Sequence, residues 1–278
     1  MELMRLADVP SGEPHHVYRH SPARALLLAG GALAALVLLL ALGWWRQNPL
    51  VYYAAGVVGL GVLIMRRNVL ARLRPSNWLV RASGEGLFIQ FRSHLNWHFP
   101  SDDPTVVFVP YQELRSARGV RETSTLPSSD AGGGVVTRRR RLVELELTDD
   151  APELARALDA ERVRRAPKEA RWYGRSSRRY HHHPVRMVSP RRMQIEWSAV
   201  PGVEAFLSAL PERVRRRAEI DVATDYAELS ALDRAEQKRR LLELVERGQT
   251  LDAIRIARKL YAYDLRRARE FVKSLRGT

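Results

Sequence analysis

Hydrophobic and polar positions divide the chain into an apolar segment near the N-terminus and a longer body with alternating patterns. Two uncharged apolar runs, Ala25–Gly43 and Leu50–Met65, are separated by a short polar turn that contains Asn48 and Pro49. A helix needs roughly 20 apolar residues to cross the hydrocarbon core of a bilayer, with about 17 as the lower end. The pattern therefore predicts a hairpin of two transmembrane helices over residues 24–66.

Arginines flank this hairpin mainly at its two ends. They are Arg5, Arg19 and Arg24 before the first run and Arg66, Arg67, Arg72 and Arg74 after the second. The turn contains only Arg46. Because basic loops stay on the cytoplasmic side, we predict a multi-pass protein of the bacterial inner (plasma) membrane with both termini in the cytoplasm. The expected membrane-interface anchors are Trp44, Trp45, Tyr52, Tyr53, Arg66 and Arg67.

A cleaved signal sequence is the alternative interpretation of the first run. That run ends in Gly43-Trp44-Trp45-Arg46 and a second apolar run follows soon after, which favours a hairpin. Neither run contains an ionisable residue. Proton and ion paths normally need such a residue inside the membrane, so the pattern argues against a transporter or channel.

The segment after the hairpin alternates with the period of two that is typical of half-buried strands. Strands are predicted at 78–82, 87–92, 105–109, 114–122, 138–147 and 193–197, and helices at 151–165 and 203–216. A Gly-rich loop is expected at 126–137 and a linker at 220–226. Residues 1–23 contain several Pro and His and are expected to form a flexible tail.

This part of the sequence resembles bacterial pleckstrin-homology-like (PH-like) domains carried behind a membrane hairpin. The resemblance rests on Gly86-Leu87-Phe88-Ile89 with Arg92-Ser93, on Val106–Pro110 with Glu113-Leu114, and on Ile195–Trp197 before the closing helix. It covers residues 77–216 and implies a split β-barrel capped by a helix, used to bind or scaffold. The insertion at 151–190 departs from the family pattern, so the strand count and any ligand pocket stay open.

Residues 226–278 show the pattern of three short amphipathic helices. The first is expected to start at Ser230–Asp233, the second at Thr250 and the third at Asp264. The run from Asp252 to Val272 is similar to the helix pair in the C-terminal domain of the bacterial ribosomal stalk protein, with Tyr261-Ala262-Tyr263 in place of the family's glycine turn. That resemblance implies a protein-docking surface. Its candidate residues are Arg255, Lys259, Arg266 and Arg269.

Charge adds a second candidate surface. The chain has 46 Lys and Arg against 31 Asp and Glu, which gives a net charge of +15, and it has no Cys. Such an excess fits an anionic partner, either lipid headgroups or nucleic acid. The candidate contacts, in which aromatic and basic residues alternate, are Arg171, Trp172, Tyr173, Arg175, Arg178, Arg179, Tyr180, Arg186, Arg191 and Arg192. A solvated basic loop is the alternative interpretation.

No nucleophile elbow, phosphate-binding loop or dinucleotide fingerprint occurs in the sequence. His94 with His98, and the run His181–His183, lack the setting of a metal site. We therefore expect no catalytic residue, cofactor, metal or small-molecule substrate.

These observations together predict an α+β membrane protein with two transmembrane helices, a PH-like split β-barrel and a C-terminal three-helix segment. The expected function is a non-enzymatic, membrane-anchored scaffold or adaptor that presents its cytoplasmic domain to anionic lipid or to a protein partner, such as another subunit of a membrane complex. A membrane-tethered nucleic-acid- or ribosome-binding protein is the main alternative. An enzyme with an unfamiliar site is a third hypothesis.

Overall fold

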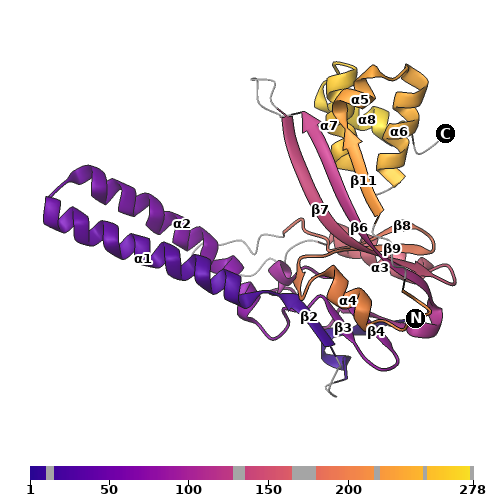
Figure 1. The fold of residues 1–278 in the computed structure, drawn as a ribbon, viewed down its shortest axis with the longest axis horizontal. Coiled ribbons are helices and arrows are strands. Elements are labelled where there is room, and N and C mark those ends of the chain that lie inside the picture. The colour runs from indigo at the N-terminus through magenta and orange to yellow at the C-terminus, as the bar shows by residue number, and fades with distance from the viewer. Residues whose placement is uncertain (11–15, 128–134, 165–179, 216–219, 247–248, 276–278) are drawn as a thin grey trace. The chain divides into compact units, whose positions relative to one another are not determined.

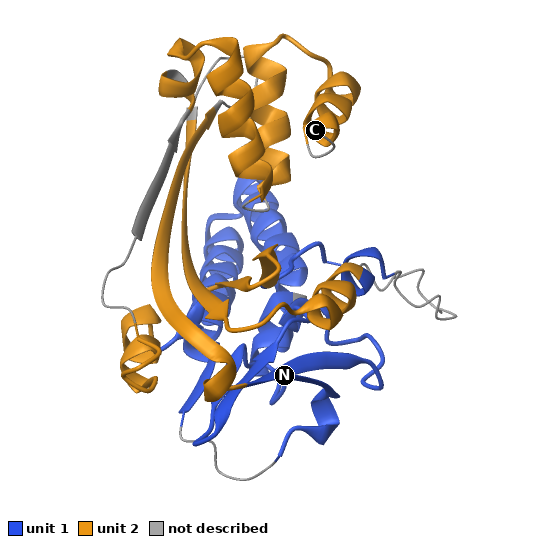
Figure 2. Ribbon diagram, turned by 90° about the vertical axis from the view of Figure 1, so that its right-hand side faces the viewer, with its two compact units in different colours: residues 1–109, 160–184, 198–201 blue, residues 110–159, 185–197, 202–278 orange. Residues whose placement is uncertain are grey.

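The computed structural model describes residues 1–10, 16–127, 135–164, 180–215, 220–246 and 249–275 (Figure 1). Within them the chain has a mixed α+β fold with two long helices and two sheets. It groups into two compact units, coloured separately in Figure 2: residues 1–109, 160–184 and 198–201 form unit 1, and residues 110–159, 185–197 and 202–278 form unit 2. The predicted domain boundaries themselves stay a prediction.

Unit 1 contains the predicted pair of helices, which run side by side in Figure 1. α1 spans Pro22–Arg46 and α2 spans Pro49–Leu73. Each starts with a proline, whose missing N–H would have no partner in a first turn anyway. The side chains of Ser21 and Asn48 cap the two N-termini by accepting hydrogen bonds from backbone N–H groups. Both helices are long and apolar enough to cross a membrane, as predicted.

Six strands of unit 1 form an open sheet in the order β1-β5-β4-β3-β2-β10. Their bounds are β1 Glu2–Arg5, β2 His16–His20, β3 Val80–Ala82, β4 Gly86–Gln90, β5 Pro104–Pro110 and β10 Ala199–Val200. Short 3-10 helices occur at Leu6–Asp8 and His94–Asn96. The expectation of a flexible tail is wrong for β1 and β2. These strands pair with β5 and β3, which lie far along the chain, so no local pattern could indicate their order.

Five strands of unit 2 form a second sheet in the order β11-β6-β7-β9-β8. Their bounds are β6 Leu114–Pro127, β7 Val135–Leu147, β8 Val185–Ser189, β9 Arg192–Glu196 and β11 Ile220–Asp225, with a 3-10 turn at Tyr111–Glu113 before β6. The predicted linker at 220–226 is wrong, because β11 pairs in parallel with β6. The predicted 126–137 loop is also wrong at its ends, where β6 and β7 continue.

Neither sheet closes into a barrel within the described residues, so the PH-like split barrel is unconfirmed. Two helices accompany the sheets, α3 at Pro152–Val163 and α4 at Val203–Ala209. α4 packs against β6 and β7 in unit 2. It ends earlier than the predicted 203–216 helix. Leu210 has extended backbone because it precedes Pro211, and a residue before proline avoids the helical region.

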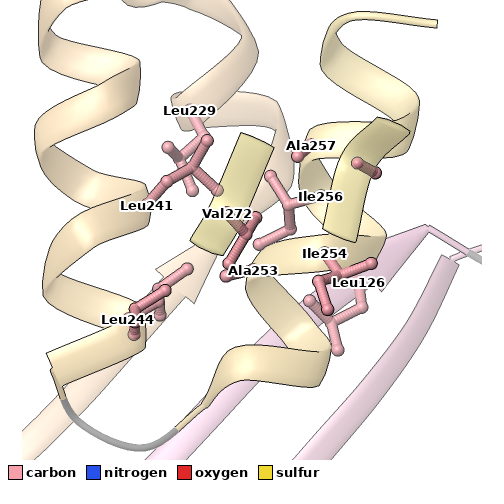
Figure 3. Packing of buried hydrophobic residues seen from close by; sticks show 11 residues of the cluster. Leu126, Leu229, Leu241, Leu244, Ala253, Ile254, Ile256, Ala257 and Val272 are labelled. Carbon is pink, nitrogen blue, oxygen red and sulfur yellow. The ribbon is translucent and has the colours of Figure 1, made fainter. Parts of the chain in front are cut away.

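The C-terminal part of unit 2 forms a small helical core. Its helices are α5 Tyr226–Ala231, α6 Arg234–Glu246, α7 Thr250–Leu260 and α8 Leu265–Ser274, and the last three correspond to the predicted ones. Asp264 caps α8 as predicted, since its Oδ1 accepts a hydrogen bond from the Arg267 backbone N at 2.7 Å. Leu241, Ile256 and Val272 from three helices share one buried cluster with Leu126 at the end of β6, and Figure 3 shows Leu126 beside Ile254 of α7.

Truncation of this core should destabilise unit 2. Leu241 is fully buried, and its replacement in Leu241→Ala should lower the free energy of unfolding by about 2–5 kcal/mol, because the lost contacts leave a cavity. The control Leu251→Ala removes the same atoms from a side chain that is 79% exposed and should change stability little. Urea titration of the full chain in mild detergent measures both. Equal effects of the two substitutions would contradict this packing.

Candidate membrane-anchoring site

The two long helices pack along one regular antiparallel seam. A Cβ atom added to Gly43 would lie 3.1 Å from the Tyr52 ring, and one added to Gly59 would lie 3.8 Å from Leu36. These contacts are seven residues apart on each helix, which is about two helical turns. The absent side chains at the two glycines therefore let α1 and α2 approach closely.

The outer sides of both helices are apolar and uncovered. Leu27 on α1 is 76% exposed and Ile64 on α2 is 69% exposed, and only 6% of the residues in each apolar span are buried. A core helix of a soluble protein would bury such side chains, because each apolar residue left in water forgoes about 1.5–3 kcal/mol. The exposure pattern thus favours membrane spans over core helices.

The predicted interface anchors lie at defined places on this hairpin. Trp44, Trp45 and Tyr53 are exposed around the turn, and Tyr52 packs on Gly43 beside them. Arg66 is exposed toward the other end, on α2, while the side chain of Arg67 lies outside the described residues. The aromatic residues are therefore gathered at one end, as an interfacial belt requires. Their contact with a membrane stays a prediction.

Both ends of the hairpin return to the same sheet. β2 leads into α1, α2 leads back to β3, and β2 and β3 are antiparallel neighbours with Tyr18 opposite Val80. The buried Asn77 joins the two ends, because its Nδ2 donates to the backbone O of His20 at 2.9 Å and of Arg72 at 2.6 Å. Cleavage after α1 would remove β1 and β2 from the sheet, so this topology argues against a cleaved signal sequence.

A histidine cluster lies at the base of the hairpin. The rings of His20 and His94 stack with centroids 4.0 Å apart, and the His182 ring meets His94 edge-on at 6.2 Å. His20 Nδ1 lies 3.0 Å from the Ser198 Oγ, and His182 Nδ1 lies 2.8 Å from the Ser93 Oγ. Among the described residues, no group of His, Asp and Glu has the arrangement of a metal site.

Burial and positive neighbours keep two of these rings neutral. Burial, together with the nearby His182 and Arg72, lowers the pKa of His20 to about 4. Burial lowers the pKa of His94 to about 3, helped by His20, His182 and Arg72. An ordinary histidine has a pKa of about 6.5. Protonation of this cluster therefore opposes the folded arrangement at the base of the hairpin.

A cluster of ion pairs around the buried Arg92 lies in the same unit. Arg92 is 6% exposed and donates to both carboxylate oxygens of Glu161 at 3.0 Å and to Asp103 at 2.7 Å. Arg164 also pairs with Asp103. Although burial opposes charge at both sites, the paired groups raise the pKa of Arg92 and lower that of Asp103. All four charges are therefore engaged with one another.

The predicted lipid or nucleic-acid contacts are only partly described. Arg171, Trp172, Tyr173, Arg175, Arg178 and Arg179 lie outside the described residues. The Tyr180 backbone binds Asn96 in both directions, at 2.8 and 3.0 Å, and Arg191 pairs with Asp150 at 2.7 Å. Arg192 is exposed at the start of β9. The structure therefore does not bring these residues together into one described surface.

Arg186 belongs instead to a row of polar side chains across the sheet of unit 2. The strand register places Arg118 opposite Glu144, Glu144 opposite Gln194, and Gln194 opposite Arg186. Gln194 accepts hydrogen bonds from Arg186 at 3.0 and 2.7 Å and donates one to Oε2 of Glu144 at 2.8 Å. Arg118 pairs with the other carboxylate oxygen of Glu144, Oε1. Arg186 is therefore engaged within the protein.

The predicted docking residues lie on the outer side of the C-terminal helices. Arg255, Lys259 and Arg269 are exposed, and no described acidic side chain pairs with them. Arg266 is exposed but pairs with Glu270 at 3.2 Å. The structure thus brings α7 and α8 together in one basic helix pair, as the pattern predicted.

Sequence reasoning missed the residues that join the hairpin to its sheet. His20 was assigned to a flexible tail, and Asn77 was given no role beyond the start of the strand region. Asn77 is only 2% exposed, and its hydrogen-bond partner His20 lies on the far side of both helices in the sequence. The two apolar runs are similar in length. A hairpin of two such helices brings residue 77 back beside residue 20, and this is the signal that the sequence offers.

The fold and the hairpin define an α+β protein with two helices of membrane-spanning length and composition. Comparisons with models of known protein families, with curated proteins and with solved structures gave no match. The resemblances to PH-like domains and to the ribosomal stalk protein therefore rest on the sequence motifs alone.

The histidine cluster predicts a loss of stability in acid. Both pKa values lie below that of an unfolded histidine, so the unfolded state takes up protons first as the pH falls. Above about pH 6.5 the two neutral rings do not lower the free energy of unfolding. Below that pH the free energy of unfolding falls by about 1.4 kcal/mol per histidine for each pH unit. Urea titrations of the full chain in detergent between pH 7.5 and 5 measure this loss.

Removal of one histidine provides the matched test. His94→Gln should remove about half of the pH dependence, whereas His181→Gln changes an exposed ring and should leave it intact. An unaltered pH dependence in a folded His94→Gln protein would show that the cluster does not cause it.

Proposed function

We propose that this chain is a non-enzymatic scaffold or adaptor, anchored in the bacterial inner membrane by its helical hairpin. The observation that carries the proposal is the insertion of an apolar, uncovered hairpin between the neighbouring strands β2 and β3. A hairpin that leaves and re-enters one sheet keeps everything attached to that sheet on one side of the bilayer. The sheet of unit 1 then lies at the membrane surface, directly connected to the two helices.

Charge supports a cytoplasmic position for this body. No acidic residue occurs between Pro14 and Gly84, so Arg19, Arg24, Arg66 and Arg72 near the base of the hairpin are not balanced by nearby acids in the sequence. Basic residues close to membrane spans stay on the cytoplasmic side. Both termini belong to the same side by this argument, because the hairpin crosses the bilayer twice.

The helix pair α7 and α8 supports a protein partner. It combines the exposed cations Arg255, Lys259 and Arg269 with two exposed leucines, Leu251 and Leu265. Apolar anchors beside arginine are typical of protein interfaces. The ion cluster of Arg92 and the polar row of Arg118 hold their charged groups against one another, which supports structural roles for them.

Reporter fusions test the membrane topology. A reporter that is active only in the cytoplasm should be active when fused after residue 278 or before residue 1, and inactive when inserted between Gln47 and Asn48. The chain should also stay in membranes washed with alkaline carbonate. Release of the chain by carbonate, or opposite activities of the two terminal fusions, would contradict the anchor.

Co-purification in mild detergent tests the scaffold. We expect a stable protein partner, and the triple substitution Arg255→Gln, Lys259→Gln and Arg269→Gln should reduce its recovery several-fold by removing charge complementarity. The control changes Arg239 and Arg240, which are exposed but pair with acidic residues on α6, to Gln. Recovery of the chain alone, or steeply salt-dependent binding to RNA in place of protein, would overturn the proposal.

A further inference from the structure

The seam between α1 and α2 opens into an apolar groove near the base of the hairpin. The groove has a volume of about 180 Å³. Ala29 and Ala32 of α1 line one side, and Val62, Met65, Arg66 and Val69 of α2 line the other. The two alanines place only small side chains on the α1 side of this groove.

The helix register places Arg66 at an unusual depth. The seam contacts Gly43 with Tyr52 and Leu36 with Gly59 step by seven residues on each helix, and the next step pairs Ala29 with Arg66, which both line the groove. Ala29 lies four residues inside the apolar run that starts at Ala25, which is about 6 Å along the helix axis. The apolar run of α2 is shorter than that of α1, so a charged residue reaches this level.

Within the described residues, Arg66 lies away from the carboxylates that could neutralise it. No described acidic side chain pairs with it, and the sequence has no Asp or Glu between Pro14 and Gly84. A cation at the edge of the hydrocarbon region extends toward the headgroups and pairs with an anion there. Guanidinium groups bind phosphate with two parallel hydrogen bonds.

We propose that this groove is a binding site for one anionic phospholipid, whose acyl chain fills the groove and whose phosphate pairs with Arg66. The proposal rests on the membrane location proposed above. Apolar cavities of about 150 Å³ exclude water and take up hydrocarbon instead. In a bilayer the hydrocarbon available at this depth is a lipid chain, and the anion available at its end is a headgroup.

A second copy of the hairpin is the less favourable occupant. Two identical chains meet through the same surface about a two-fold axis. Packing through this groove would bring the two Arg66 side chains to the same interface. Like charges repel strongly where water is scarce, whereas an anionic lipid neutralises the same residue.

Lipid binding by the full chain tests the site. The chain is purified in mild detergent, and native mass spectrometry compares bound phosphatidylglycerol with bound phosphatidylcholine of the same acyl chains. Wild type should prefer phosphatidylglycerol. Arg66→Gln should reduce that preference about fivefold, the factor expected from one basic residue near an anionic lipid. Ala29→Leu should reduce binding of both lipids by filling the groove.

The matched control is Arg46→Gln, which removes the same charge at the opposite end of the hairpin and should leave the preference intact. Equal binding of the two lipids by wild type, or an effect of Arg46→Gln as large as that of Arg66→Gln, would overturn the site. Cross-linked dimers that disappear in Ala29→Leu would overturn it too, because a second copy would then occupy the groove.

Failure of the membrane anchor and failure of the lipid site give different experimental results. Carbonate extraction of wild type removes the chain from membranes if the hairpin does not insert, which contradicts the proposed function. A chain that resists extraction but shows no preference between the lipids contradicts only the lipid site.

Discussion

The pairing of β2 with β3 is the constraint on which unit 1 depends. These short strands hold the two ends of the 59-residue excursion over residues 21–79 side by side, and Asn77 joins the ends with hydrogen bonds to the backbone at His20 and Arg72. The helices α1 and α2 must then be antiparallel and of matching length. Each spans 25 residues, and only Ser21 separates β2 from α1. The strand pairing thus brings the two helices together as one hairpin that starts and ends at the same sheet.

Buried polar contacts specify how each unit packs. Arg92 with Glu161 and Asp103 in unit 1, and the row from Arg118 to Arg186 in unit 2, place charges where burial alone would disfavour them. Such groups add little net stability when complete, but removal of one partner leaves an uncompensated charge that costs about 3–5 kcal/mol. In unit 2, buried Gln249 donates to Glu122, which joins the start of α7 to the sheet.

The base of the hairpin combines positively charged arginines with histidine rings that are neutral. Its surface is rich in arginine, which suits the anionic headgroups of a cytoplasmic leaflet. Directly beneath, the rings of His20 and His94 are buried close to Arg72 and stay neutral at physiological pH. The neutrality of these rings allows the aromatic stacking that supports β2 and the 3-10 turn at His94–Asn96. A positive charge on either ring would lie close to Arg72 and would oppose the fold.

Sequence patterns determined the features that depend on neighbouring residues. Apolar runs and flanking arginines located α1 and α2, alternation located β7 and β9, and the amphipathic stripe and Asp264 located α8. Local signals suffice there because helix periodicity and capping involve residues within about four positions of one another. The early end of α4 was equally local, since Pro211 marks it, but the apolar stripe through Val214 suggested a longer helix.

Only the tertiary structure decided the features that join distant segments. β1, β2 and β11 are short strands whose pairing partners supply the hydrogen bonds that stabilise them, so their own sequences resemble a tail or a linker. The same holds for Asn77, for the histidine cluster and for the position of Arg66 opposite Ala29, which follows from the register of the two helices. A strand or a polar contact of this kind has no local stability, and its energy comes from the partner that the fold places beside it.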